Sequence, residues 1–218
     1  MTVVAIDGPG GSGKSTVARE LARRLGVERL DTGAMYRAVA LRALRTGTPV
    51  GDEKALTGVA REMVLELGDP VLLDGEDVSD AIRGDDVEAV VSTVAAHPAV
   101  REVLVSRQRD WIAAHGSCVV EGRDIGTVVA PGADLKVYLT ADPSERARRR
   151  AEDERAVASR GRGGERGDPA VVRRSIGRRD ALDRGRAASP LAVAPGAVVV
   201  DSTGRSVEEV VEELWGLL

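Results

Sequence analysis

Five short apolar runs alternate with amphipathic stretches along this chain of 218 residues. The runs are rich in Val, Leu and Ile and hold few charges, as is typical of parallel strands that are buried on both faces. We expect strands at residues 3–6, 27–30, 117–121, 134–140 and 197–200. Strands that alternate with helices in this way predict an α/β fold, a five-stranded parallel sheet flanked by helices, with ligands beyond the carboxyl ends of the strands.

Between the strands, apolar residues recur at three- and four-residue spacing and predict helices. The first helix is expected from Ser15, and Gly26 stands where a glycine commonly ends a helix. A second is expected from residue 34 to about residue 45, with Thr32 as its N-cap.

Three more helices are expected later in the chain. Pro98 separates predicted helices at 87–96 and 99–114 and is well placed to start the second. The run Ser-Val-Glu-Glu at 206–209 is a capping box before an amphipathic helix, and we expect Trp215 to complete the core there.

Residues 51–86 interrupt the alternation of strands and helices. A helical piece at 55–63 is followed by two apolar runs that flank Asp74-Gly75, a strong signal for a β-hairpin. We therefore interpret 51–86 as an insertion that stands off the main sheet.

An arginine-rich helical stretch begins near Pro143, is broken by glycines at 161–164 and resumes over 168–183. Basic residues crowd between 146 and 186, although the formal net charge is -4. This stretch suggests a nucleic-acid-binding module, but it contains no Phe, Tyr or Trp on which bases could stack, and its acids weaken any phosphate-tracking stripe. We expect no nucleic-acid partner.

The composition, 43% hydrophobic and 30% charged, is that of a globular protein rather than a disordered one. The lone cysteine, Cys118, excludes an internal disulfide framework and a cysteine-rich metal site, and is interpreted as a small buried hydrophobe.

No segment has the length of a membrane span, and no basic n-region precedes the first apolar run. We expect a cytoplasmic protein without a membrane partner and, because no exposed apolar stripe is obvious, a monomer.

A phosphate-binding loop follows the first strand. The chain reads Gly-Pro-Gly-Gly-Ser-Gly-Lys-Ser and runs into a helix whose N-terminal N–H groups and dipole favour an anion. Lys14 is expected to reach the β- and γ-phosphates of ATP, and the Ser15 hydroxyl to bind Mg²⁺. The predicted ATP-binding residues are Gly8, Pro9, Gly10, Gly11, Ser12, Gly13, Lys14, Ser15 and Thr16.

Four further motifs accompany this loop: Asp-Thr-Gly-Ala-Met-Tyr-Arg from Asp31, Ser92 with Val-Arg-Glu at 100–102, Glu-Gly-Arg-Asp-Ile-Gly-Thr-Val-Val from Glu121, and Arg-Arg-Asp-Ala-Leu-Asp-Arg-Gly-Arg at 178–186. With them, nearly the whole chain resembles the bacterial cytidylate kinases, a branch of the nucleoside monophosphate kinases. The resemblance implies a single P-loop kinase domain over 1–218 that transfers a phosphoryl group from ATP to CMP and dCMP, in pyrimidine nucleotide metabolism. It also implies that the insertion is the monophosphate-binding subdomain and that residues of about 150–170 form a helical lid.

The resemblance assigns roles to individual side chains. It places the acceptor's phosphate on Arg37, Arg123 and Arg186, the cytosine edge on Ser92, Arg101 and Asp124, the sugar on Arg179 and Asp183, and Thr32 and Tyr36 beside the nucleotide. Arg149 and Arg150 match paired lid arginines that clamp the transferring group, so the catalytic set is Lys14, Arg123, Arg186, Arg149 and Arg150. A solvated helix face, paired with Glu145 and Glu152, is an equal alternative for the last two.

The chemistry agrees with these assignments. Cytosine carries an amino donor at position 4 and acceptors at O2 and N3, so a carboxylate and a guanidinium suit its edge. A nucleoside monophosphate already supplies the nucleophile, with a second ionisation at a pKa of about 6, so the reaction needs positioning and charge neutralisation rather than a general base. Glu121 or Asp7 could support the metal through water. The alternative function is a P-loop kinase of UMP or another small acceptor.

Overall fold

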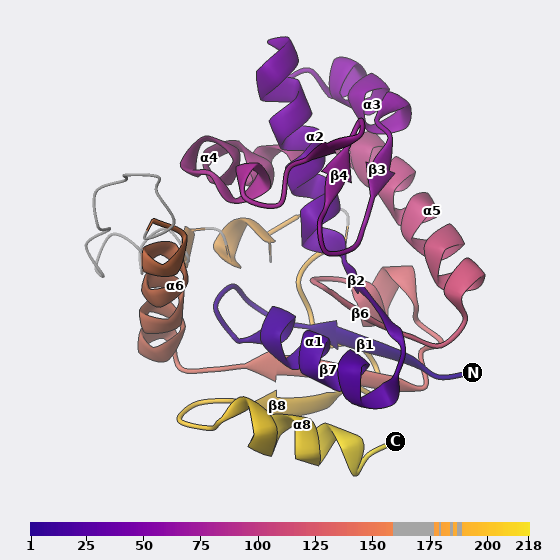
Figure 1. The fold of residues 1–218 in the computed structure, drawn as a ribbon, viewed down its shortest axis with the longest axis vertical. Helices are drawn as coiled ribbons and strands as arrows, with labels where there is room; N and C mark the ends of the chain where they lie inside the picture. Colours follow the sequence, from indigo (N-terminus) through magenta and orange to yellow (C-terminus); the bar gives the residue numbers. More distant parts are fainter. Residues whose placement is uncertain (159–176, 179, 184, 187–188) are drawn as a thin grey trace.

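The structure, a computed structural model, describes residues 1–158, 177–178, 180–183, 185–186 and 189–218 (Figure 1). Its centre is a five-stranded parallel sheet with the strand order β2-β6-β1-β7-β8. Every strand expected from the sequence is confirmed, with each boundary within one residue of its expected place. The strands are β1 (Val3–Asp7), β2 (Glu28–Asp31), β6 (Cys118–Gly122), β7 (Leu135–Thr140) and β8 (Val198–Asp201).

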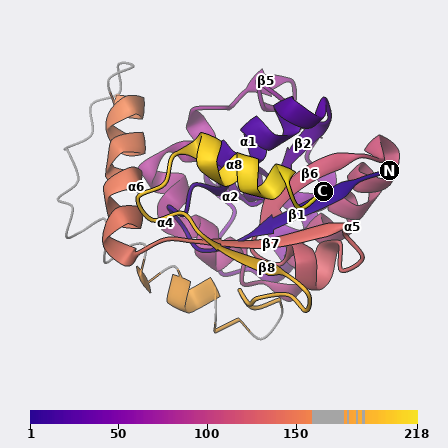
Figure 2. The ribbon, with the colours of Figure 1, turned by 90° about the horizontal axis from the view of Figure 1, so that it is seen from below.

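The side chains of β1 alternate between two apolar clusters, one on each face of the sheet. Val4 and Ile6 pack with α1 (Lys14–Leu25) and α8 (Val207–Trp215), which lie side by side in Figures 1 and 2. Ala5 points to the opposite face, towards the cluster that contains α2 (Thr32–Thr46) and α5 (Pro98–His115). Burial on both faces explains why β1 and the first three residues of β6, at the centre of the sheet, are apolar, whereas the edge strand β2 carries charged residues.

The strand order reverses at β1, because β6 lies on one side of it and β7 on the other. A crevice opens beyond the carboxyl ends of the strands at such a point, and ligands of open α/β sheets bind there. The phosphate loop leaves β1 at this point and enters α1 with Gly13 as N-cap.

The helix ends follow the predicted signals with one exception. Gly26 closes α1 in the left-handed conformation, with a φ of 66°, as expected. The cap of α2, however, is Asp31 and not Thr32. Asp31 stands in extended backbone at the end of β2, and its carboxylate accepts a hydrogen bond from Ala34 N at 3.1 Å. Thr32 is already helical, and its hydroxyl donates to the carbonyl of Glu121 at 2.7 Å.

Residues 51–86 form a small layer outside the main sheet (Figure 1). The expected hairpin is present, since Asp74 and Gly75 both have positive φ, 51° and 84°, as a tight turn between twisted strands requires. A third short strand, at 65–66, completes an antiparallel sheet. The elements are α3 (Glu53–Glu62), β3 (Leu65–Glu66), β4 (Leu72–Leu73), β5 (Glu76–Asp77) and η1 (Ala81–Arg83).

Beyond this layer, α4 (Asp85–Val94) packs on α2, and α5 begins with Pro98 in its first turn, as predicted. A π-helical turn, η2 (Ile125–Val129), follows β6 and was not expected. The arginine-rich stretch begins with α6 (Pro143–Ala158). Of the predicted lid at 150–170 and the helix at 168–183, residues 159–176 and 179 lie outside the described residues.

The capping box at the start of α8 is confirmed, but the prediction for Trp215 is wrong. Its side chain is 43% exposed and lies beside the guanidinium of Arg24, 5.9 Å from the ring centre. Leu214 and Val211 form the buried face of this helix, and the next residue is turned about 100° away from it. Within the described ranges, no helix combines the length and apolar character that crossing a membrane requires.

Candidate active site

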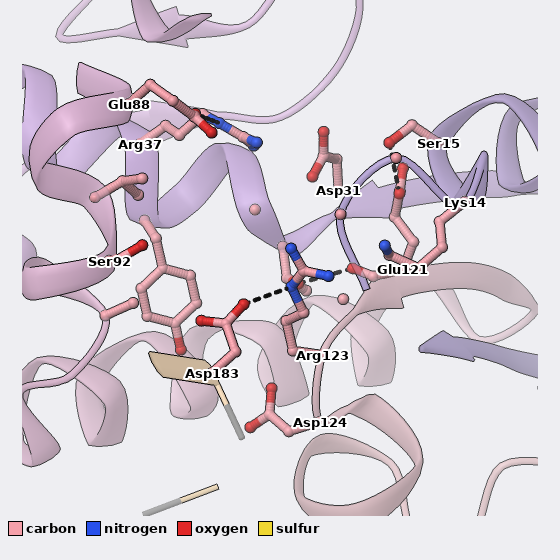
Figure 3. A pocket seen from close by; sticks show the side chains of 18 of the residues that line it. Lys14, Ser15, Asp31, Arg37, Glu88, Ser92, Glu121, Arg123, Asp124 and Asp183 are labelled. Carbon is pink, nitrogen blue, oxygen red and sulfur yellow. Dashed lines mark hydrogen bonds and ion pairs between the residues drawn. The ribbon is translucent and has the colours of Figure 1, made fainter. Parts of the chain in front are cut away.

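A pocket opens at the carboxyl ends of the strands, between the phosphate loop, the start of α2, α4 and the segment after β6. In Figure 3, Lys14, Ser15 and Glu121 gather at one end, while Arg37, Glu88 and Ser92 lie at the other, with Arg123 and Asp183 between them. The residues that line it include the predicted site residues Gly10, Gly11, Gly13, Lys14, Ser15, Thr16, Thr32, Tyr36, Arg37, Ser92, Arg101, Glu121, Arg123, Asp124, Arg150, Asp183 and Arg186.

The phosphate loop is packed tightly against the sheet. A Cβ on Gly8 would lie 2.0 Å from the carbonyl oxygen of Leu139, so only glycine fits there. The ammonium group of Lys14 donates to the carbonyl of Pro9 at 2.7 Å. Burial, together with the charge of Arg123, lowers the pKa of Lys14 to about 7. A polyphosphate placed beside it would favour the charged form again.

Ser15 and Glu121 form a pair of oxygen donors beside the loop. The Ser15 hydroxyl donates to Glu121 Oε2 at 2.7 Å, and Arg29 contacts Glu121 Oε1 at the same distance. Burial raises the pKa of Glu121, and these two partners oppose the shift. A hydroxyl beside a carboxylate suits Mg²⁺, which prefers oxygen ligands and takes its others from water and nucleotide phosphates. No group of three His, Cys, Asp or Glu side chains that could hold a metal occurs in the described part of the chain.

Asp7 is placed differently. Its two carboxylate oxygens accept hydrogen bonds from the backbone N–H groups of Ile125 and Gly126, at 2.8 and 2.7 Å. Burial raises its pKa to about 6. Asp7 therefore fixes the turn that carries Arg123 and Asp124, and it does not line the pocket.

At the far end of the pocket, Arg101 and Asp124 form a buried ion pair, with 2.5 Å between Nη2 and Oδ2. Arg101 also lies over the ring of Tyr36, 5.3 Å from its centre. Burial raises the pKa of Tyr36 to about 12, so its hydroxyl stays neutral. The Nε atom of Arg101 is buried and has no hydrogen-bond partner among the described residues, so it is a donor available to a ligand.

Cationic side chains from several elements line this pocket. Arg123 contacts Asp183 at 3.0 Å and donates to the carbonyl of Gly8, and Arg186 also donates to Asp183. On the opposite wall, Glu88 lies 3.8 Å from Arg37 and 3.2 Å from Arg150. Several guanidinium groups facing one cavity suit an anionic ligand with phosphate groups.

Some predicted site residues lie outside the pocket lining. Gly8, Pro9 and Ser12 shape the loop from behind. Arg149 also lies there: it donates to the hydroxyl and carbonyl of Ser202, at 2.9 and 2.7 Å, and pairs with Glu145 at 2.8 Å. Arg150 reaches the pocket, where it pairs with Glu88 at 3.2 Å. Arg179 lies outside the described residues.

Sequence reasoning missed two charged residues of the pocket wall. Arg83 lies 3.9 Å from Asp31, and Glu88 joins α4 to the arginines of α2 and α6. Both stand in a run of charges between 83 and 88 that resembles an ordinary solvated surface. Their position at the end of the insertion, facing the strand ends, was the only signal that could have indicated them.

Sequence similarity to known proteins extends over nearly the whole chain. The family model described as Cytidylate kinase matches residues 4–218. Proteins named cytidylate kinase from Nocardia farcinica, Geobacillus kaustophilus and Symbiobacterium thermophilum are 51%, 48% and 49% identical to it. The alignments cover 97%, 99% and 97% of this chain and 91%, 95% and 93% of those proteins.

Among solved structures, an uncharacterized protein from Eubacterium ventriosum has a similar fold, with a TM-score of 0.55 at 11% identity. The match covers 99% of this chain and 97% of that one and, at this identity, concerns the fold alone. The full-length sequence matches confirm the resemblance stated from the motifs and do not favour a kinase with another acceptor. The chain belongs to the cytidylate kinase family.

Proposed function

We propose that this protein transfers the γ-phosphoryl group of ATP to CMP and dCMP, forming CDP and dCDP by direct in-line displacement. One observation carries the proposal beyond family membership. The pocket begins at a phosphate loop and ends at the buried pair Arg101–Asp124, a donor and an acceptor suited to the edge of cytosine. A 4-oxo group in place of the amino group would face the carboxylate, and buried polar sites reject such a mismatch strongly.

The donor end holds ATP by its phosphates. The N–H groups of the loop and of the start of α1 surround the β-phosphate, and Lys14 contacts the β- and γ-phosphates. Ser15 would bind Mg²⁺ directly, and Glu121 would accept hydrogen bonds from its water ligands. When bound, Mg²⁺ neutralises charge on the β- and γ-phosphate oxygens. Asp7 has no part in holding the metal, because both of its carboxylate oxygens accept hydrogen bonds from backbone N–H groups.

The acceptor end holds the monophosphate and its base. Arg37, Arg123 and Arg186 bind the phosphate, and Asp183 keeps the last two in place. Ser92, Arg101 and Asp124 read the base, while Tyr36 and Thr32 pack beside it. Asp183 and Arg179 bind the sugar of the acceptor nucleotide.

The transfer itself requires alignment and charge neutralisation. The acceptor phosphate supplies the attacking oxygen as a dianion, so no side chain has to remove a proton. Lys14, Arg123, Arg186 and Arg150 offset the charge of the two phosphates as they approach. Arg149 acts on the same reaction from outside the pocket: it binds the Ser202 hydroxyl, and this hydroxyl donates to the carbonyl of Ser12 in the phosphate loop at 3.0 Å.

Several finer properties belong to the same proposal. Residues 51–86 act as the monophosphate-binding subdomain, residues of about 150–170 act as the lid, and 1–218 forms one kinase domain. Use of ATP and CMP supports a place in pyrimidine nucleotide metabolism and in the cytoplasm. We propose a monomer, which light scattering tests by giving the mass of one chain, 22.9 kDa.

An ADP-release assay with ATP and Mg²⁺ tests the function. CMP, dCMP, UMP, AMP, shikimate and no acceptor are offered in parallel. We expect the fastest turnover with CMP and dCMP. ADP release that is indifferent to the acceptor would mean an ATPase, and the roles given to the acceptor arginines would have to be withdrawn.

A further inference from the structure

The two peptide groups that flank the Cα of Gly10, inside the phosphate loop, are both held by one ion pair. Its N–H donates to Asp180 Oδ1 at 3.1 Å, and its carbonyl accepts from Arg146 Nη1 at 3.0 Å. The same Arg146 nitrogen lies 2.5 Å from Asp180 Oδ2. Gly10, Arg146 and Asp180 close a ring of contacts, so the orientation of both peptide groups of Gly10 is fixed as long as the ion pair is intact.

Both charged residues are buried, with 8% of Arg146 and 3% of Asp180 exposed, and neither lines the pocket. Arg146 also donates to the carbonyl of Ala141 at 3.2 Å. A Cβ on Gly11 would lie 2.5 Å from the carbonyl oxygen of Arg146, so the loop packs directly on α6. Arg146 and Asp180 are thus buried charges that lie outside the pocket lining and bind the backbone of the phosphate loop.

The loop gains a defined shape from this contact. Glycine backbones have many conformations to lose, and Gly10 and Gly11 stand side by side at the turn. A phosphate loop binds ATP only when its remaining N–H groups point into one hollow. The hydrogen bond from the Gly10 N–H to Asp180 fixes the backbone conformation immediately before the N–H groups that bind phosphate.

The helical segment that carries Asp180 also serves the other substrate. Residues 180–183 are helical, and Asp183, three positions on, holds Arg123 and Arg186. Residues three apart share a helix face, so this single turn contacts the donor loop and the acceptor arginines at once.

We propose that Asp180 and Arg146 are positioning residues of the ATP site, which hold the phosphate loop in its binding shape. The inference rests on the proposed function for its kinetic consequence, and on the contacts above for its binding consequence. Removing either charge leaves the other buried and releases one of the two peptide groups of Gly10, so ATP affinity falls while the acceptor site keeps its own anchors.

The test compares Asp180→Asn with Asp183→Asn and with Glu152→Gln, which alters only an exposed ion pair on the same helix as Arg146. The dissociation constant for ATP is measured by calorimetry, and KM for ATP and for CMP by ADP release. For Asp180→Asn we expect the ATP constants to rise ~10- to 100-fold, as a misplaced phosphate site implies, with KM for CMP within about threefold of wild type. Asp183→Asn should show the opposite pattern, and Glu152→Gln neither.

A merely structural pair would lower the melting temperature and the fraction of active enzyme without changing either constant for the molecules that remain folded. Unchanged ATP constants, or equal increases for ATP and CMP, would overturn the proposal. If Asp180→Asn does not fold, Arg146→Lys takes its place, because it keeps the positive charge and removes the planar guanidinium. The same ATP dissociation constant and KM values then decide the outcome. Wild-type enzyme without CMP-dependent ADP release would refute the proposed function instead, and the calorimetric ATP constants would still decide the role of Asp180.

Discussion

The guanidinium of Arg101 and the carboxylate of Asp124 lie 2.5 Å apart, with 4% and 7% of their side chains exposed. Arg101 comes from α5, and Asp124 from the turn after β6, so the pair joins two elements across the end of the pocket. Burial of both charges means that each depends on the other, and on a ligand, for its solvation.

Removing Arg101 should therefore cost stability as well as activity. We expect Arg101→Met to lower the free energy of unfolding by about 3–5 kcal/mol, because it leaves the Asp124 carboxylate buried and unpaired. Urea unfolding measures the loss. The double variant Arg101→Met/Asp124→Leu should recover most of it, and Arg23→Met, which breaks an exposed pair with Glu20, should change nothing measurable. A loss no greater for Arg101→Met than for Arg23→Met would contradict this account.

ATP binding should take up a proton on Lys14. The pKa of this group is about 7 in the free protein, and the adjacent phosphates raise it when ATP binds. At pH 8 the free ammonium group is about nine-tenths deprotonated, so close to one proton is taken up per ATP bound. Calorimetric titration in two buffers of different ionisation enthalpy gives the number of protons taken up per ATP bound. Lys14→Arg, whose side chain is always charged, should show no uptake; equal uptake in both proteins would refute the assignment.

The Mg²⁺ requirement should depend on Glu121. Chelation of the metal should abolish turnover, and Glu121→Gln should raise the Mg²⁺ concentration for half-maximal rate by about tenfold or more, because the water ligands lose a charged acceptor. Initial rates at fixed ATP across a Mg²⁺ series measure the shift. The control is Glu28→Gln, an exposed residue of β2. Identical Mg²⁺ curves for Glu121→Gln and wild type would exclude Glu121 from the metal site.

Much of this architecture could be predicted from local patterns. The central strand β1 is almost entirely apolar because both of its faces are buried, and a glycine-rich turn between strand and helix has few other uses. The cap of α2 could not be assigned so easily, since Asp31 and Thr32 are both good caps and the exact end of β2 decides between them. The prediction of a buried Trp215 failed for a similar reason, because a shift of one residue along a helix turns a side chain from the core to solvent.

The pocket residues divide in the same way. Those within motifs, such as Lys14 and Asp124, lie where the motifs predict, at strand ends that the fold brings together. Glu88 of α4 and Arg83 of η1 belong to no motif, and only the packing of these two elements on α2 brings them to the site. Arg149 shows the converse, because a long side chain on a correctly predicted helix can contact the backbone of a loop, here the carbonyl of Ser12, from outside the pocket.

Asp7 gives the protein a predictable dependence of stability on pH. Its pKa in the folded state is about 6, above its ordinary value of 3.8, so between these values the folded chain binds more protons than the unfolded chain. The contribution of Asp7 to stability is therefore greatest near pH 4 and falls as the pH rises through 6, by at most about 3 kcal/mol. Urea unfolding of wild type and Asp7→Asn from pH 4 to 7 measures this difference. A difference that stays constant or grows with pH would contradict the assignment.

The central claim, that Asp124 reads the amino group of cytosine in a phosphoryl transfer from ATP, is tested most directly by one ratio. That ratio is kcat/KM for CMP over kcat/KM for UMP, measured for wild type and for Asp124→Asn. We predict a preference for CMP of ~100-fold or more in wild type, and a fall of at least ~10-fold in that ratio in the variant, because an amide can donate to the 4-oxo group of uracil. The same ratio in both proteins, with only the rates reduced, would contradict the account.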